Sequence, residues 1–176
     1  MDVLIRQELA DDYTAVYKLV KRAFEQEPMG GGNEQDLVER LRRSSSFIPE
    51  LSLVATVNNE IVGHILLTRL KIVAGDQTDI SLALAPVSVM PEYQKNGIGG
   101  MLIKAAHAKA QELGFKSIIL VGHETYYPRF GYVQLDNFEI SLPFEVPPQN
   151  AMVLELETGA LKNTKGEVIY DSAFFQ

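Results

Sequence analysis

Three glycines stand where a helix is expected to begin. Gly97, Gly99 and Gly100 follow the apolar stretch "VSVMPEYQKN", and the sequence "MLIKAAHAKAQELG" after them has the spacing of an amphipathic helix. The first amide N–H groups of a helix have no partner within it, and the helix dipole adds about half a positive charge there. Glycine removes the Cβ atoms that would hold an anion away from those groups. The stretch therefore predicts a phosphate-binding site.

Tight packing is an alternative explanation for the same glycines, because a residue without a side chain also lets a helix lie close to a strand. Two common phosphate-binding patterns do not fit the spacing. It differs from the GxxxxGK[ST] of a P-loop, and from GxGxxG with an acidic residue after a second strand, as in dinucleotide-binding folds. The pattern by itself leaves both explanations open.

The stretch "VSVMPEYQKNGIGG" resembles the signature of the GCN5-related N-acetyltransferases (GNAT), in which a strand and V-x-P-x-x precede [QR]-x-x-G-x-[GA]. The stretch "YYPRFGY" is similar to a second landmark of that family, a tyrosine four residues before Gly-Phe or Gly-Tyr. Together these stretches place the resemblance at about residues 82–133. The resemblance implies acetyl-CoA as the acetyl donor and a primary amine as the acceptor.

The resemblance also implies which residues contact acetyl-CoA. Main-chain amides from Lys95 through Gly100 would hold the pyrophosphate, in a loop that Gln94 opens. Strand backbone at 87–89 would face the pantetheine arm and the thioester, with the amide of Val89 donating to the developing oxyanion. The cofactor-binding residues expected on this basis are Val87, Ser88, Val89, Gln94, Lys95, Asn96, Gly97, Ile98, Gly99 and Gly100.

Tyr127 occupies the position of the family's general acid, so the resemblance assigns it the catalytic donation of a proton to the departing sulfur. An ordinary tyrosine pKa of about 10 keeps the hydroxyl protonated at neutral pH. Tyr126 is a rival because it is adjacent. The structural alternative is that both rings pack beneath the last strands.

The general base is not identified by the sequence. Many relatives use a glutamate on the strand before the glycines, and the corresponding stretch here, "LALAPVSV", has no carboxylate. Glu25, Glu27 and Glu34 stand near the loop that is expected to border the acceptor site, but solvated surface charge explains each of them as well.

Histidines add two further expectations. Many relatives carry an asparagine that touches the pantetheine, whereas "VGHETYYPRF" offers His123 or Glu124 instead. His64 and His107 share no metal-ligand spacing with His123, so no metal is expected.

Turn residues and hydrophobic spacing predict the order of the elements. The first half is expected to contain a strand at 3–6, a helix capped by Asp11-Asp12 and ending near Phe24, a loop at 28–32, a helix from 33 or 34 to about 43, and an antiparallel hairpin of 51–57 and 61–71. The second half is expected to contain a polar connection at 74–79, a strand at 82–89, a helix from 98 to a C′ residue at Gly114, strands at 116–121 and 151–156, and a small extra strand at 167–170.

Pro86 cannot donate to a sheet ladder, so it predicts a bulge or an unpaired edge in the strand at 82–89. The strand–helix–strand unit that follows makes the strands at 82–89 and 116–121 parallel neighbours. The predicted fold class is α/β (α+β), a single domain over residues 1–176, with a mixed, mostly antiparallel central sheet flanked by helices. Its parallel strands are splayed, and its cofactor-binding core spans about 82–133.

The composition limits the classes of function. Of the 176 residues, 46% are hydrophobic and 22% are charged, as in ordinary globular proteins, and the net charge of −7 argues against a nucleic-acid binder. No cysteine is present to carry an acyl intermediate. No apolar run approaches the ~20 residues of a membrane span, and no leader pattern precedes the first strand, so a cytoplasmic protein is expected.

The leading interpretation is an N-acetyltransferase in which a primary amine of a small molecule or peptide attacks acetyl-CoA directly in a ternary complex. The missing base motivates an alternative, a catalytically inactive domain that binds acyl-CoA as a sensor. Neither nucleic acid nor membrane is an expected partner, and a homodimer remains an open alternative. The sequence does not identify the acceptor.

Overall fold

The computed structural model describes residues 1–28 and 31–176, so the predicted loop at 28–32 lies partly outside the described residues. Strands of the described part form one sheet in the order β1-β2-β3-β4-β5-β8-β6, with β9 beside β3 and β7. They are β1 (Val3–Gln7), β2 (Phe47–Val57), β3 (Glu60–Ala74), β4 (Gln77–Val89), β5 (Ser117–Val121), β6 (Val133–Gln134), β7 (Ile140–Ser141), β8 (Ala151–Glu155) and β9 (Gly166–Ile169).

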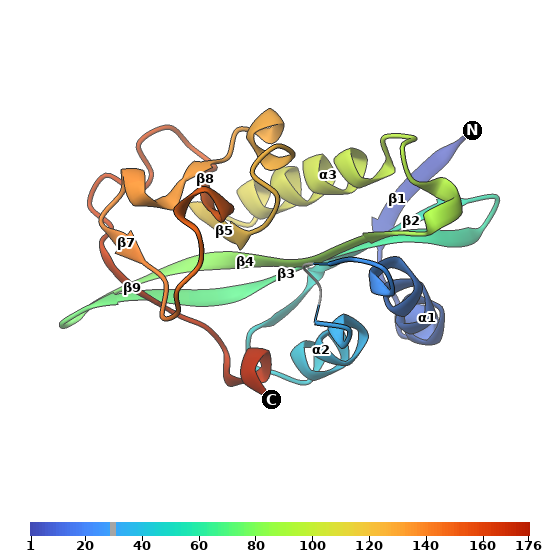
Figure 1. Ribbon diagram of the computed structural model, residues 1–176, viewed down its shortest axis with the longest axis horizontal. Coiled ribbons are helices and arrows are strands. Elements are labelled where there is room, and N and C mark those ends of the chain that lie inside the picture. Colours follow the sequence, from blue (N-terminus) through green and yellow to red (C-terminus); the bar gives the residue numbers. More distant parts are fainter. Residues whose placement is uncertain (29–30) are drawn as a thin grey trace.

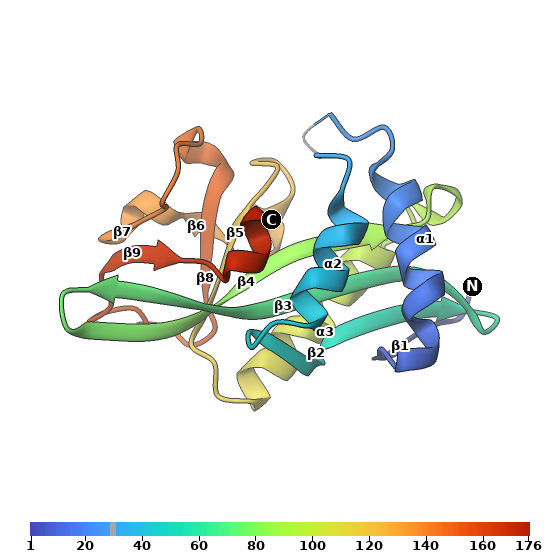
Figure 2. The same cartoon turned by 90° about the horizontal axis from the view of Figure 1, so that it is seen from below.

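Helices cover both faces of this sheet. Helix α3 (Ile98–Glu112) lies on one face, whereas α1 (Tyr13–Phe24) and α2 (Glu34–Arg42) lie on the other, with the short turn at 172–175 beside α2 (Figure 1). In the view turned by 90°, α1 and α2 lie side by side across the strands (Figure 2). The mixed, mostly antiparallel sheet flanked by helices confirms the predicted fold class.

The central hairpins are longer than the sequence suggests. Strands β2 and β3 pair antiparallel as predicted, and β3 then pairs with β4 along most of its length. The prediction of a polar connection at 74–79 is wrong in part, because 77–79 pair with 72–74 of β3 and only Gly75 and Asp76 form the turn. The β-branched residues of the partner strand and the left-handed φ of Gly75 (+59°) allow polar residues to extend the ladder.

Strand β4 is irregular at Pro86, as predicted. Val87 pairs with Ile65 and Leu84 pairs with Leu67, so both Ala85 and Pro86 lie opposite Leu66 in a bulge. On its other side β4 pairs with β5 in parallel at two positions, Leu82 with Ile118 and Ala83 with Ile119. The two strands separate beyond these pairs, which confirms the splayed parallel neighbours.

The first helix begins differently from the prediction. The carboxylate of Asp12 does not cap α1; it accepts from the amide of Leu9 at 2.8 Å and from both terminal nitrogens of Arg6 at 2.7 and 3.0 Å. The guanidinium of the neighbouring strand offers a charged, bidentate partner, which outcompetes the helix amides. The pKa of Asp12 is lowered, mainly by this bond to Arg6.

Helix α3 packs closely on the sheet. The predicted apolar face is confirmed for Ile98, Leu102, Ala106 and Ala110, which are buried, but Leu113 is 39% exposed because the helix ends before it. Gly114 follows in the left-handed conformation (φ +88°) and is the predicted C′ residue. On the sheet, a Cβ atom at position 63 would lie 2.9 Å from Leu102 Cδ1, so the glycine there permits this close contact.

The last third completes the sheet. Strand β8 pairs antiparallel with β5, and β9 pairs with 71–73 of β3 beyond the end of β2, near the extra strand predicted at 167–170. The two-residue strands β6 and β7 carry no periodic signal and were not predicted. Within the described ranges, no helix has both the length and the apolar character that crossing a bilayer requires.

Candidate active site

A cavity of about 1010 Å³ opens where β4 and β5 separate. Its walls come from both sides of the sheet, since the start of α3, the end of α1 and the start of α2 all contribute. The residues that line it include Glu27, Glu34, Leu84, Ala85, Pro86, Val87, Val89, Gln94, Lys95, Gly97, Ile98, Gly99, Gly100, Lys104, Val121, Gly122, His123, Tyr126, Tyr127, Arg129 and Phe130.

The edge of β4 that faces this cavity carries main-chain donors. Met90 donates to the carbonyl of Val62 at 2.8 Å, and the register pairs Ser88 with His64. Because alternate residues of a strand direct their N–H groups to opposite sides, Val87 and Val89 direct theirs away from β3, toward the side that β5 has left. The carbonyl of Val89 accepts from Gln94 Nε2 at 3.1 Å on that side.

The loop before α3 is held open by its own contacts. Lys95 and Gly97 both have left-handed φ angles, +66° and +79°, and a Cβ on Gly97 would meet no atom within 4 Å. Asn96 Nδ2 donates to the carbonyls of Tyr93 and Gln94 at 3.0 and 3.1 Å, which fixes the turn. Met101 makes the first helical bond, to the carbonyl of Gly97 at 3.0 Å, so the amides at 98–100 precede the helical ladder.

Two of the three glycines also serve packing. A Cβ on Gly99 would lie 3.1 Å from the hydroxyl of Tyr126, and one on Gly100 would lie 3.4 Å from the ring of Phe130. Gly99 and Gly100 thus allow the close approach of aromatic side chains, whereas the one strand atom near a Cβ on Gly99, Val89 Cγ2, would lie at an ordinary contact distance of 3.8 Å. Gly97 alone faces open space.

Tyr127 lines the cavity and also belongs to the hydrophobic core. It is 9% exposed, and its ring packs edge-on against Tyr126 and Tyr132, with centroids 5.1 and 5.8 Å apart. The pKa of Tyr127 is raised above its ordinary value, mainly by burial and further by Tyr126 and Glu27. The hydroxyl thus stays protonated at neutral pH.

Positive side chains surround the start of α3. Lys95, Lys104 and Arg129 all line the cavity. Arg129 lies over the ring of Tyr126, 4.7 Å from its centroid, and donates to the carbonyl of Tyr126 at 2.9 Å. The helix amides and these cations together form an electropositive end of the cavity, which suits an anionic ligand.

Carboxylates lie at the other end. Glu27 and Glu34 line the cavity from the α1–α2 side. His123 Nε2 lies 3.5 Å from Glu27 Oε1. Glu34 Oε1 accepts from the amide of Gly31 at 2.7 Å, whereas its Oε2 is buried and makes no hydrogen bond to the described residues. This end suits a cationic group.

The cavity does not include every residue expected from the sequence. Ser88 is 3% exposed and pairs with His64 of β3, so its side chain is buried in the sheet. The side chain of Asn96 forms hydrogen bonds within its own loop. Neither lines the cavity, and neither do Glu25 and Glu124. The period of two along β4 accounts for Ser88. Among the described residues, His, Asp and Glu side chains form no group of three that could hold a metal ion.

Sequence reasoning missed the residues that hold Tyr127. Gly122 follows the last residue of β5 and lies beside this ring, and Asn150 fixes Gly122 by accepting from its amide and donating to its carbonyl, both at 2.9 Å. Tyr132 supports the ring from the other side, while its own hydroxyl lies 2.8 Å from His107 Nε2. Asn150 is far from Gly122 in sequence, so no local pattern indicated the pair.

The sequence profile of the acetyltransferase (GNAT) domain matches residues 5–135 of this chain. The chain belongs to the GNAT acetyltransferase family. A curated relative, the uncharacterized N-acetyltransferase YjhQ of Escherichia coli (strain K12), is 39% identical over 111 residues, which cover 63% of this chain and 61% of that protein.

Solved structures share the fold over almost the whole chain. The N-acetyltransferase YhbS of Escherichia coli, crystallised with CoA, superposes with a TM-score of 0.88 and 23% identity, covering 99% of this chain and 92% of that one. A GNAT family acetyltransferase of Brucella melitensis, crystallised with acetyl-CoA, gives a TM-score of 0.80 and 27% identity, covering 98% of each chain.

Proposed function

We propose that this chain is an acetyl-CoA-dependent N-acetyltransferase that acts on a primary amine in a ternary complex. The observation that carries the proposal is the opening between β4 and β5. Around it one cavity is lined by the start of α3, the outward edge of β4 and Tyr127. The acetyl-CoA complex of the Brucella relative supports the choice of donor.

The residues of the electropositive end fit the diphosphate of coenzyme A. The amides at 97–100 precede the helical ladder, the open side of Gly97 leaves room for a ligand, and Lys95, Lys104 and Arg129 add charge. When bound, acetyl-CoA supplies the acetyl group: the amine nitrogen bonds to the carbonyl carbon, the carbon–sulfur bond breaks, and CoA leaves as thiolate or thiol.

Val89 and Tyr127 serve the reacting end in this proposal. The amide of Val89 donates to the oxygen of the thioester carbonyl as negative charge develops on it. Burial raises the pKa of Tyr127 above its ordinary value, whereas a thiol has a pKa of about 8.5. The hydroxyl is therefore the weaker acid, and it stabilises the departing sulfur through a hydrogen bond instead of transferring its proton completely.

The carboxylates at the opposite end face the acceptor. Glu27 and Glu34 attract a protonated amine, and a carboxylate at this end accepts the proton that the nitrogen must lose before or during attack. The product amide has no basic nitrogen, so it loses this attraction and leaves.

An acyl-CoA sensor is the second candidate, because β4 carries no carboxylate at the position many relatives use. Calorimetry with acetyl-CoA, followed by a thiol-release assay over polyamines, amino sugars, amino acids and peptide N-termini, separates the two. Binding with steady CoA release supports the enzyme. Binding without release across the panel supports the sensor, and absence of binding contradicts both.

A further inference from the structure

A second cavity adjoins the first through the sheet. It measures about 230 Å³ and shares Leu84, Ala85 and Val121 with the cavity described above. It also touches Ala83 and Ile119, which belong to the core cluster of the face opposite α3. The gap between β4 and β5 thus opens on one side to the start of α3 and on the other to this smaller cavity.

Four aromatic rings form the outer wall of the smaller cavity, and they are those of Phe144, Tyr170, Phe174 and Phe175. Tyr170 is central, with centroid distances of 5.7 Å to Phe144, 5.1 Å to Phe174 and 6.1 Å to Phe175. Phe144 and Phe175 are 40% and 62% exposed, so their rings are available to a ligand. We call this cavity the aromatic pocket.

The rings are held by fixed backbone. The turn at 172–175 is tied to the helical layer, since Arg40 Nε donates to the carbonyl of Ala173 at 2.9 Å. Asp171 accepts from the amide of Ala173 at 2.9 Å and from Ser46 Oγ at 2.7 Å. A pocket built on such anchored segments is preformed, which reduces the ordering cost of binding.

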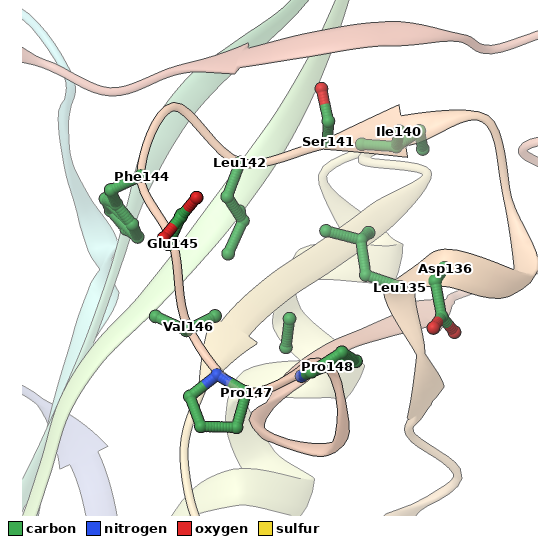
Figure 3. Close-up of a pocket in the computed structure, with 11 residues that line it drawn as sticks. Leu135, Asp136, Ile140, Ser141, Leu142, Phe144, Glu145, Val146, Pro147 and Pro148 are labelled. Carbon is green, nitrogen blue, oxygen red and sulfur yellow. The ribbon is translucent and has the colours of Figure 1, made fainter.

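Phe144 belongs to a proline-rich loop that also lines a separate cavity of about 630 Å³. Figure 3 shows Leu135 and Leu142 on facing walls of that cavity, with Phe144 at the end farthest from Asp136. Pro143, Pro147 and Pro148 restrict the backbone of this loop and limit the positions of Phe144.

The chemistry of the aromatic pocket selects an apolar group. Of its ten lining residues, Tyr170 alone carries a polar side-chain atom. A sugar ring or a polyamine chain would lose its water there without gaining partners, which is costly. A single aromatic ring fits the volume, because a cavity of about 150 Å³ suffices for benzene.

We propose that the aromatic pocket binds the apolar body of the acceptor, and that the acceptor is a primary amine bearing an aromatic ring near its nitrogen. This inference rests on the proposed function, since it identifies the substrate class of the same site. The ring enters the pocket from the gap, and the nitrogen remains beside Leu84 and Ala85, which line both cavities.

The test compares 2-phenylethylamine with ethylamine and spermidine. In the thiol-release assay we expect kcat/KM for 2-phenylethylamine to exceed that for ethylamine by about tenfold to hundredfold, the effect of burying one ring. The double variant F144A/F175A should reduce this ratio to near one while leaving the KM for acetyl-CoA unchanged. Ile169→Ala is the matched control, because Ile169 is 44% exposed and lies beside Tyr170 outside the pocket.

Calorimetric titration of 2-phenylethylamine into the CoA-saturated protein gives a readout that does not depend on turnover. Binding that is weakened in the double variant and retained in Ile169→Ala supports the pocket, even if no amine is acetylated and the proposed function fails. Acetylation with equal preference for all three amines, or a preference that the double variant retains, overturns the pocket and leaves the proposed function standing. If 2-phenylethylamine neither binds nor is preferred over ethylamine as a substrate, the aromatic pocket is also overturned.

Discussion

A Cβ atom built on Gly122 would lie 2.6 Å from Cε2 of Tyr127, closer than nonbonded atoms approach in proteins. The backbone of Gly122 is bonded to Asn150 through both its amide and its carbonyl, so it resists displacement. The absence of a side chain at Gly122 therefore permits the observed position of the Tyr127 ring.

The first prediction concerns this contact. Gly122→Ala should push the ring of Tyr127 aside and lower kcat by roughly 10- to 100-fold, because a displacement of about 1 Å of a catalytic group has such effects. Calorimetry should show acetyl-CoA affinity changed by less than about threefold, since none of the residues proposed to hold the diphosphate contacts Gly122. An unchanged kcat would mean that the position of Tyr127 is irrelevant to the reaction.

The second prediction separates the two adjacent tyrosines. Tyr127→Phe removes only the hydroxyl, and we expect kcat to fall by about 100-fold or more. Tyr126→Phe is the matched control, with an expected change in kcat of less than about fivefold, because its hydroxyl lies over Gly99. Thermal unfolding of both variants checks that the fold is intact. The reverse order of effects would make Tyr126 the donor.

The third prediction concerns the start of α3. Gly99→Glu and Gly99→Gln introduce side chains of equal size beside Tyr126, so both disturb packing, but only glutamate adds a negative charge near the diphosphate. We expect the dissociation constant for acetyl-CoA to be at least about tenfold higher in the glutamate variant, because like charges placed together cost several kcal/mol. Added salt should reduce the difference in acetyl-CoA affinity between the two variants. Equal affinities in calorimetry would contradict a diphosphate at this position.

The fourth prediction arises from a buried polar network beneath α2. Arg42 donates to Glu8 at 2.6 and 3.1 Å, and Ser52 Oγ lies 2.8 Å from Glu8 Oε1 and 3.0 Å from His64 Nε2. His64 is fully buried, and its Nδ1 has no partner among the described residues. Burial lowers the pKa of His64 to about 4, with Glu8 opposing this shift and Arg42 adding to it.

The unfolded chain therefore binds more protons at His64 than the native protein does between about pH 6.5 and 4. The free energy of unfolding should be highest above pH 6.5 and should decrease, by on the order of 3 kcal/mol, as the pH falls toward 4. Urea unfolding across this range measures it, and His64→Gln should flatten the dependence. His107, whose pKa burial also lowers to about 4, adds a change of the same sign. An identical pH dependence in His64→Gln and the wild type would contradict this account.

Structural features with local causes could be predicted from the sequence. Pro86 predicted the irregularity of β4 because a missing N–H acts at its own position, and the small residues of α3 predicted its close packing on the sheet. The hairpin boundary at 77–79 was missed because the partner strand, rather than local propensity, stabilises those polar residues.

Contacts between different structural elements were not predictable from the sequence. Arg6 diverts Asp12 from the helix cap, and Asn150 fixes Gly122, although neither pair has a local pattern. The aromatic pocket unites Phe144 with rings at 170–175, which come together only because β9 pairs with β3 and the following turn reaches α2. Only the tertiary fold brings these rings to the gap between β4 and β5.

A crystal structure of this protein with bound CoA tests the central claim most directly. The account predicts diphosphate oxygens within hydrogen-bonding distance, about 2.7–3.2 Å, of main-chain nitrogens at 97–100, with the pantetheine arm along Val87 and Val89 in the gap between β4 and β5. A diphosphate bound away from the start of α3, with those nitrogens satisfied by protein groups, would contradict it.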